Sequence, residues 1–171
     1  MAYSNVTKTA MAEAMKALMA EMPFSRVSVG DICERCGMNR KSFYYHFIDK
    51  YDLVNWIFQT EFLEVLNVQD YTSGWGLIAD LCAYFYKERA FYADALRIEG
   101  QNSFSDFFSA ALNAILPEVL RDPFETPEDS RFFFDFFTDA IKTAITRWLT
   151  ETAPVPPEVF TERLRKTVGS R

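Results

Sequence analysis

The chain has 171 residues, of which 49% are hydrophobic, 16% aromatic and 25% charged, and its formal net charge is −6. A chain of this length accommodates one sizeable core, or a module of about 50 residues packed against a larger one. The composition is typical of an ordered globular protein and excludes a disordered or fibrous chain. The net negative charge argues against a protein coated in basic residues for bulk nucleic-acid binding.

Charge is distributed unevenly along the chain. Residues 1–52 hold seven Lys/Arg and six Asp/Glu, whereas residues 53–171 hold eleven Lys/Arg and eighteen Asp/Glu. A nearly neutral N-terminal head therefore precedes an acidic body. Four basic residues of the head lie in one short segment: Arg35, Arg40, Lys41 and Lys50.

The sequence carries no sign of export or of a membrane anchor. Charged residues interrupt the apolar positions of residues 6–22, so this region does not resemble a signal peptide. No uninterrupted apolar stretch reaches the roughly 18 residues that a membrane-spanning helix needs. Three cysteines fit a reducing compartment better than a disulfide framework. We therefore expect a soluble, cytoplasmic protein.

The first two helices are predicted from apolar spacing and capping signals. Residues 7–22 carry apolar side chains at the three- and four-residue spacings that line one face of a helix, and Pro23 ends this pattern. Ser28 followed by Asp31 forms a capping box that begins a second helix. Gly37 suits the left-handed conformation found just beyond a helix C-terminus.

A third helix is predicted immediately after this glycine, with Asn39 as its N-cap. The residues expected to face outward are Arg40, Lys41, Tyr44 and Tyr45. Those expected to face inward are Met38, Phe43 and Phe47. Two short helices joined by a turn of about three or four residues containing Gly form a helix-turn-helix, whose second helix enters the major groove of DNA.

The remaining elements are also predicted to be helical. A longer helix, from Asp49 to about Gln69, has apolar residues on several sides and is expected to connect head and body. Further helices are predicted over 75–89, after an Asn102 cap, and from Thr126 to about Thr150. A short segment over 90–98, a kink or end at Pro117, a proline-rich connector over 154–157 and a short final helix complete the pattern.

No alternating strand pattern is present, so the predicted fold class is all-α. We expect a three-helix helix-turn-helix domain over residues 1–50 and a larger helical domain over residues 51–171.

Residues 7–54 resemble the N-terminal DNA-binding domain of TetR-type transcriptional regulators. The residues that carry this resemblance are Val29, Asp31, Ile32, Gly37, Phe43, Tyr44, Tyr45, His46, Phe47, Lys50 and Leu53. Residues 43–58 also resemble the subgroup that contains the activator of dihydroxyacetone kinase operons. The resemblance implies that the body is an all-helical ligand-binding and dimerisation domain.

Polar side chains of the third predicted helix are the candidates for reading DNA. Arg40 and Lys41 can donate hydrogen bonds to phosphate or to guanine O6 and N7, and Asn39 or Ser42 can reach phosphate or base edges. The alternative is a solvated basic helix face.

Further residues are candidates for phosphate contacts. The resemblance implies such contacts from Tyr44, Tyr45 and His46, with the alternative that one of them packs. Lys50 combines its charge with the free amides at a helix N-terminus. Ser28 is both a cap and a candidate phosphate contact, although the cap alone explains it.

Two enzyme-like features have simpler explanations. Cys33 and Cys36 form a Cys-x-x-Cys pair, but zinc needs about four ligands and no second pair is present, so core packing is the preferred interpretation. His46 is the sole histidine and has no recognisable catalytic partner motif. We predict no catalytic residues, no metal site and no cofactor.

The aromatic helix near the C-terminus has two interpretations, an ordinary core or a dimer interface. TetR-type proteins pair through this region, and we favour the interface, with some of the Phe residues serving the core. The residues predicted at the interface are Phe133, Phe136, Phe137, Ile141, Ile145, Trp148, Phe160 and Leu164.

The sequence thus predicts a transcriptional regulator that binds a palindromic operator in double-stranded DNA as a homodimer. A small-molecule effector or a protein partner is expected to act on the C-terminal domain. Repression is the commoner mode in the family, and the subgroup resemblance leaves activation open. The alternatives are a protein–protein adaptor that keeps the helix-turn-helix scaffold and, third, a small helical enzyme.

Overall fold

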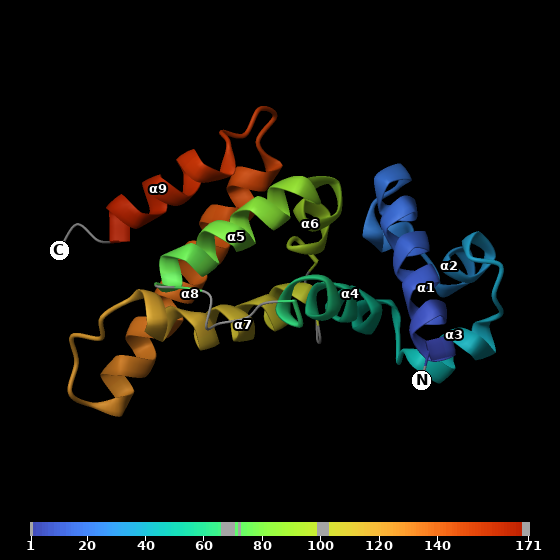
Figure 1. Ribbon diagram of the computed structural model, residues 1–171, viewed down its shortest axis with the longest axis horizontal. Helices are drawn as coiled ribbons and strands as arrows, with labels where there is room; N and C mark the ends of the chain where they lie inside the picture. The colour runs from blue at the N-terminus through green and yellow to red at the C-terminus, as the bar shows by residue number, and fades with distance from the viewer. Residues whose placement is uncertain (1, 66–70, 72, 99–102, 169–171) are drawn as a thin grey trace. The chain divides into compact units, whose positions relative to one another are not determined.

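The computed structural model describes residues 2–65, 71, 73–98 and 103–168, and regular structure within them is entirely helical (Figure 1). This confirms the predicted all-α class. The elements are α1 (Ala2–Glu21), η1 (Phe24–Arg26), α2 (Val29–Arg35), α3 (Arg40–His46), α4 (Lys50–Phe58), η2 (Gln59–Leu63), α5 (Gly74–Lys87), α6 (Arg89–Ala95), α7 (Phe104–Val119), α8 (Pro127–Thr150) and α9 (Pro157–Val168).

The chain divides into two compact units. The first comprises Met1–Val65 with Ala90–Ser105, and the second comprises Leu66–Arg89 with Asp106–Arg171. The first unit therefore holds α4 and most of α6 in addition to the three helices of the predicted head. The functional boundary near residue 50 stays a prediction.

In the first unit, α1 packs against α2, α3 and α4 (Figure 1). Its buried face carries Met11, Met15 and Leu18, which are at most 3% exposed. Ile32 of α2 and Phe43 of α3 are fully buried in the same unit. Burying an apolar side chain of this size contributes about 1.5–3 kcal/mol, so this small core is what fixes α2 and α3 relative to α1.

The connecting helix, predicted from Asp49 to about Gln69, changes its hydrogen-bonding pattern part of the way along. The α-helical part ends at Phe58, and a π-helical turn follows over Gln59–Leu63, in which the Glu64 amide donates to the Gln59 carbonyl at 2.8 Å. Phe58 and Phe62 stack with ring centroids 5.4 Å apart. The end of the prediction, residues 66–69, lies outside the described residues.

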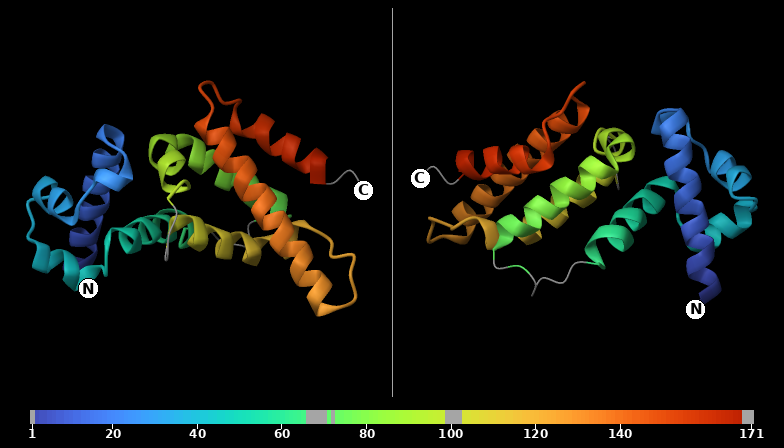
Figure 2. Two further views of the ribbon diagram at one scale, coloured as in Figure 1. Left: turned by 180° about the vertical axis from the view of Figure 1, so that it is seen from behind. Right: turned by 45° about the horizontal axis from the view of Figure 1, so that its top comes forward.

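In the second unit, α5 packs against α9 and α8, and both views of Figure 2 show these helices side by side. Trp148 of α8 stacks on Phe160 of α9, with ring centroids 4.3 Å apart and planes at 3°. Its indole N–H donates to the Val155 carbonyl at 2.8 Å, which fixes the proline-rich connector between the two helices. Arg89 Nε donates to the Leu149 carbonyl at 2.7 Å, near the C-terminus of α8.

Several predicted boundaries are shifted. Helix α1 begins at Ala2, before the predicted residue 7, and α7 continues through Pro117 to Val119. Thr126 caps α8 as predicted, because its side chain accepts a hydrogen bond from the Asp129 amide at 3.2 Å. The predicted Asn102 cap lies outside the described residues.

Candidate nucleic-acid interface

The turn between α2 and α3 is a Schellman motif built on Gly37. The Gly37 amide donates to the Glu34 carbonyl at 3.2 Å, and the Met38 amide donates to the Cys33 carbonyl at 2.8 Å. Gly37 has φ of +68°, the left-handed conformation predicted from the sequence. The chain therefore reverses over a few residues and delivers Asn39 to the start of α3.

Helix α2 begins with the predicted capping box. Ser28 Oγ accepts from the Asp31 amide at 3.2 Å, while Asp31 Oδ2 accepts from the Ser28 amide at 2.8 Å. Hydrogen bonds from the Ser28 side chain and backbone lower the pKa of Asp31. Ser28 is exposed and fully explained by this cap, and its phosphate contact stays a prediction.

Helix α3 presents a polar face because its apolar side points into the core. Asn39 Oδ1 accepts from the Ser42 amide at 2.8 Å, as the N-cap prediction requires. Phe43 and Phe47 are 0% and 3% exposed, whereas Tyr44 and Tyr45 are 57% and 82% exposed. The remaining members of the predicted contact set also reach the surface. Asn39, Arg40 and Lys41 are exposed, and Ser42 and His46 are half-buried.

Arg40 lies back against α2. A Cβ placed on Gly30 would be only 2.8 Å from Nη2 of Arg40, so the guanidinium occupies the space that the missing side chain leaves. Its charge also contributes to the lowered pKa of Asp31, after the two Ser28 hydrogen bonds. The sequence pattern does not single out Gly30, because only the tertiary contact reveals its role.

Lys50 is directed into the first unit. Its ammonium donates to the carbonyls of Phe24 and Val27, both at 2.8 Å, and lies 4.2 Å from the centroid of the Phe24 ring. Burial lowers the pKa of this ammonium. Two of its three donors thus serve the turn before α2, and the phosphate contact predicted for Lys50 stays a prediction.

Two of the free amides expected at the start of α4 are also engaged. Asp49 Oδ1 accepts from the amides of Tyr51 and Asp52, both at 2.8 Å, which caps α4. The phosphate-binding arrangement predicted there would therefore require Asp49 to release these amides.

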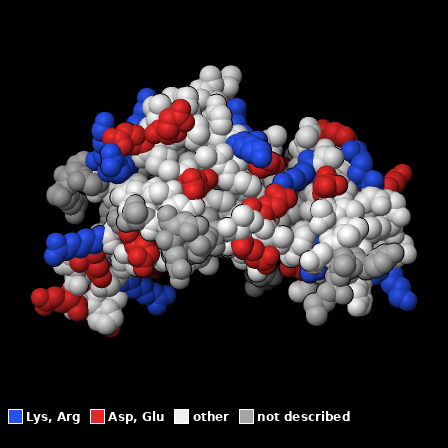
Figure 3. Space-filling model, in the orientation of Figure 1, with Lys and Arg blue, Asp and Glu red and all other residues white. Residues whose placement is uncertain are grey.

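Two other cations of the head, Arg35 and Lys8, contact residues of their own unit. Arg35 is paired with Glu21 through hydrogen bonds of 2.8 and 2.7 Å, so it joins α2 to α1. Lys8 of α1 lies 5.6 Å from the ring centroid of Phe47 and 5.5 Å from that of Trp56. Figure 3 shows acidic and basic side chains interspersed on the face in view. Arg40 and Lys41 supply the exposed positive charge of α3.

Cys33 lies on the inner side of α2, and Cys36, the residue just after this helix, is half-buried. Cys33 is 3% exposed, and burial, followed by the nearby Cys36, raises the pKa of its thiol. Within the residues that the structure describes, no group of three or more potential ligands is arranged to hold a metal ion.

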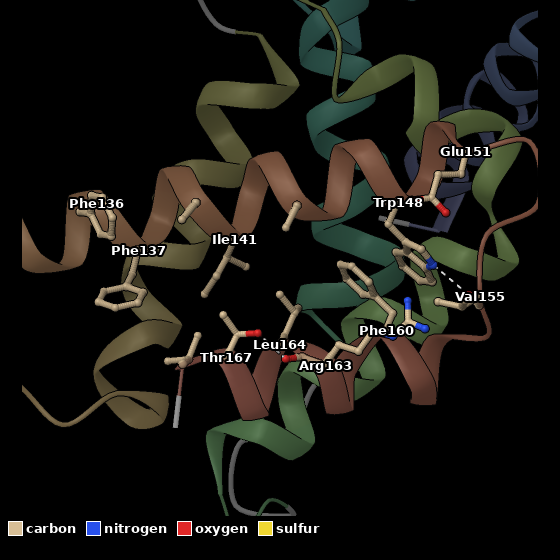
Figure 4. Close-up of a pocket in the computed structure, with 13 residues that line it drawn as sticks. Phe136, Phe137, Ile141, Trp148, Glu151, Val155, Phe160, Arg163, Leu164 and Thr167 are labelled. Carbon is tan, nitrogen blue, oxygen red and sulfur yellow. Dashed lines mark hydrogen bonds between the residues drawn. The ribbon is translucent and has the colours of Figure 1, made fainter. Parts of the chain in front are cut away.

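A groove of about 490 Å³ runs along α8 and α9 in the second unit. Figure 4 shows side chains from the two helices pointing into it, with Phe137 and Ile141 on α8 opposite Leu164 and Thr167 on α9. Most of the lining is apolar, and Glu151 and Arg163 are its charged members.

The eight residues predicted at a dimer interface fall into two groups. Ile141, Ile145 and Trp148 are at most 2% exposed within the single chain, which leaves them little area to offer a partner. The others retain exposed area, and Phe136 is 58% exposed. The half-buried residues of this second group are Phe133, Phe137, Phe160 and Leu164.

Comparison with known proteins agrees with this architecture. Residues 11–57 match the family described as bacterial regulatory proteins, tetR family, and residues 76–170 match the family described as transcriptional regulator C-terminal region. The first match contains the helix-turn-helix, and the second contains the groove-forming helices. The fold and this site define a DNA-binding helix-turn-helix regulator, and the chain belongs to the TetR family of transcriptional regulators.

The chain is 29% identical over 123 residues to the HTH-type dhaKLM operon transcriptional activator DhaS of Lactococcus lactis subsp. lactis (strain IL1403). That match covers 71% of this chain and 65% of the relative, slightly less than two thirds of its length.

Solved structures share the fold over nearly the whole chain. A dihydroxyacetone kinase operon activator, DhaS, has a TM-score of 0.69 at 22% identity, covering 96% of this chain and 97% of that one. A TetR regulator from Streptococcus agalactiae 2603V has a TM-score of 0.75 at 20% identity, with coverages of 97% and 95%. The fatty acid degradation regulator FadR from Bacillus halodurans has a TM-score of 0.63 at 14% identity, with coverages of 95% and 94%.

None of the described helices is both long enough and apolar enough to span a membrane.

Proposed function

We propose that this protein binds a palindromic operator as a homodimer, with α3 in the major groove, and that an effector or partner acting on the second unit controls this binding. The observation that carries the proposal is the pairing of a buried frame with an exposed polar face on one short helix. Phe43 and Phe47 fix the helix in the core, and Arg40, Lys41 and Tyr44 stand exposed beside them.

The charge distribution supports a role for this one face. The body, residues 53–171, carries seven more acidic than basic residues, so its net charge opposes attraction to DNA. Arg40 and Lys41 supply local positive charge, and the tyrosine hydroxyls can donate to phosphate. A homodimer doubles this small face, which increases both affinity and the length of sequence read.

The α8–α9 groove supports the homodimer. Its lining is mostly apolar and comes from both α8 and α9. Such a surface suits packing against the same two helices of a second copy around a two-fold axis. Phe136, Phe137 and Leu164 supply apolar area that a monomer leaves partly in water. Binding to successive major grooves would require the two α3 helices of such a dimer to lie about 34–36 Å apart.

The L. lactis relative is named a transcriptional activator, which supports activation as the mode in this subgroup. No catalytic role is proposed, since the families and relatives matched are transcriptional regulators.

Selection from random DNA duplexes tests the proposal. The purified protein is expected to enrich a palindrome with half-sites one helical turn apart. A variant carrying Arg40→Ala, Lys41→Ala and Tyr44→Ala should enrich none, whereas Arg131→Ala, which removes a cation that is 85% exposed on α8, should enrich the same palindrome. A wild-type protein that enriches nothing at low salt would refute sequence-specific binding.

A further inference from the structure

The peptide groups of Phe24 are held on both sides by charged side chains. The Phe24 N–H donates to Asp94 Oδ2 at 2.6 Å, and the Phe24 carbonyl accepts from the Lys50 ammonium at 2.8 Å. The carboxylate meets the positive end of one peptide dipole, and the ammonium meets the negative end of the next. Hydrogen bonds to ionised groups are roughly twice as strong as those between neutral groups.

Phe24 lies in the short turn that leads into α2, the first helix of the helix-turn-helix. It begins η1, the short turn that links α1 to α2, and Val27 immediately precedes the Ser28 cap. The Lys50 ammonium also donates to the Val27 carbonyl at 2.8 Å, so one side chain holds both ends of this turn. The start of α2 is therefore fixed by contacts to the first residue of α4.

The turn is closed by packing as well as by charge. Phe24 and Val27 are 2% and 1% exposed. The Phe24 ring meets Tyr51 edge-on, with centroids 5.0 Å apart. A buried amide without its acceptor would carry a desolvation penalty. The Asp94 carboxylate removes this penalty by accepting the hydrogen bond from the Phe24 amide.

Asp94 belongs to α6, 70 residues away in sequence from its partner, and within the same compact unit. We propose that Asp94 is a positioning residue for operator binding. It ties α6 to the turn that carries α2 and α3, so operator affinity depends on where α6 lies as well as on the side chains of α3. This inference rests on the proposed DNA-binding function.

Three variants test the role. Asp94→Ala removes the acceptor, Asp94→Asn keeps an acceptor oxygen without charge, and Lys50→Met removes the donor to the Phe24 carbonyl. Glu125→Ala, which removes an exposed carboxylate from the loop before α8, controls for the change in net charge. Each is measured for affinity on the operator that the wild-type protein enriches and for hydrogen exchange of the Phe24 amide by NMR.

We expect Asp94→Ala to remain folded, to weaken operator binding about tenfold, the order of magnitude of one hydrogen bond to a charged group, and to speed exchange of the Phe24 amide. Lys50→Met should weaken binding similarly. Asp94→Asn should recover most of the affinity, and Glu125→Ala should match the wild type.

Wild-type affinity in Asp94→Ala, or failure of Asp94→Asn to recover binding, would overturn the positioning role. An Asp94→Ala protein that does not fold would overturn it in favour of a purely structural role. If the wild-type protein enriches no operator, the proposed function itself fails and this inference fails with it.

Discussion

The guanidinium of Arg40 lies over the backbone of Gly30, where a Cβ would be 2.8 Å from Nη2. A residue of the second helix thereby determines how a candidate DNA contact on the third helix is held. Arg40 is presented by the packing of α2 as well as by its own position on α3.

Gly30→Ala is predicted to displace Arg40 without unfolding the head. The new methyl group meets only the flexible end of a side chain and the Ser28 hydroxyl at 3.3 Å, and alanine favours a helix over glycine by up to about 1 kcal/mol. Denaturation should show unchanged or slightly higher stability. Operator affinity, measured by fluorescence anisotropy, should fall between those of the wild type and Arg40→Ala. Full wild-type affinity would mean that the contact with Gly30 has no part in presenting Arg40.

Gly37→Ala is predicted to destabilise the protein through backbone strain alone. Gly37 has φ of +68°, and a Cβ there would meet nothing within 4 Å. The left-handed conformation costs an ordinary residue about 1–2 kcal/mol, so the free energy of unfolding should fall by this amount. Gly37→Asn should cost less, because asparagine tolerates this conformation better. Equal decreases for the two variants would contradict an origin in the φ angle.

Phe137→Asp is predicted to separate the homodimer. The side chain lines the α8–α9 groove, and a carboxylate there would lose hydration when a second copy covers it. Sedimentation velocity should show a folded monomer, and operator affinity should fall with it. The matched control is Val159→Asp, which places the same charge on an exposed position of α9 outside the groove lining. A folded Phe137→Asp protein that stays dimeric would place the interface elsewhere.

Cys82 is predicted to make stability fall in alkaline solution. Burial raises the pKa of its thiol from the ordinary 9.0 to about 12. Between these values the unfolded chain loses this proton and the folded chain keeps it, so rising pH stabilises the unfolded state. The free energy of unfolding that Cys82 contributes is fully present below about pH 9 and is lost as the pH rises toward 12. Over this interval the free energy of unfolding falls by up to about 1.4 kcal/mol per pH unit.

The measurement for Cys82 is chemical denaturation at several pH values from about 8 to about 10.5, where the slope should be present in the wild type. Cys82→Ala should show a shallower dependence over the same interval. An identical pH dependence in the two proteins would show that the buried thiol titrates alike in the folded and unfolded states.

The head is predictable from the sequence because its determinants are local. Ser28 and Asn39 cap helices within three residues of themselves, and Gly37 specifies a turn through its own φ angle. The contact of Asp94 with Phe24 spans 70 residues, and no spacing rule anticipates it.

Tertiary packing decides the role of other residues. Lys50 has the sequence position of a free cation near a helix N-terminus, but the turn before α2 uses its ammonium. Ile145 shares the apolar stripe of α8 with Phe137, yet it is fully buried in the single chain. The spacing of apolar residues along a helix cannot distinguish a residue that packs against its own chain from one that packs against a second copy.

If the exposed face of α3 binds the operator, substitutions on that face must lower the affinity of the protein for the selected duplex. Arg40→Ala, Lys41→Ala and Tyr44→Ala, measured singly over a range of salt concentrations, should each weaken binding, while Arg131→Ala should not. Where the replaced side chain is a cation that neutralises a phosphate, the salt slope should also become shallower by about 0.9 for that phosphate. Wild-type affinity and salt slope in all three variants would show that this face of α3 does not bind the operator.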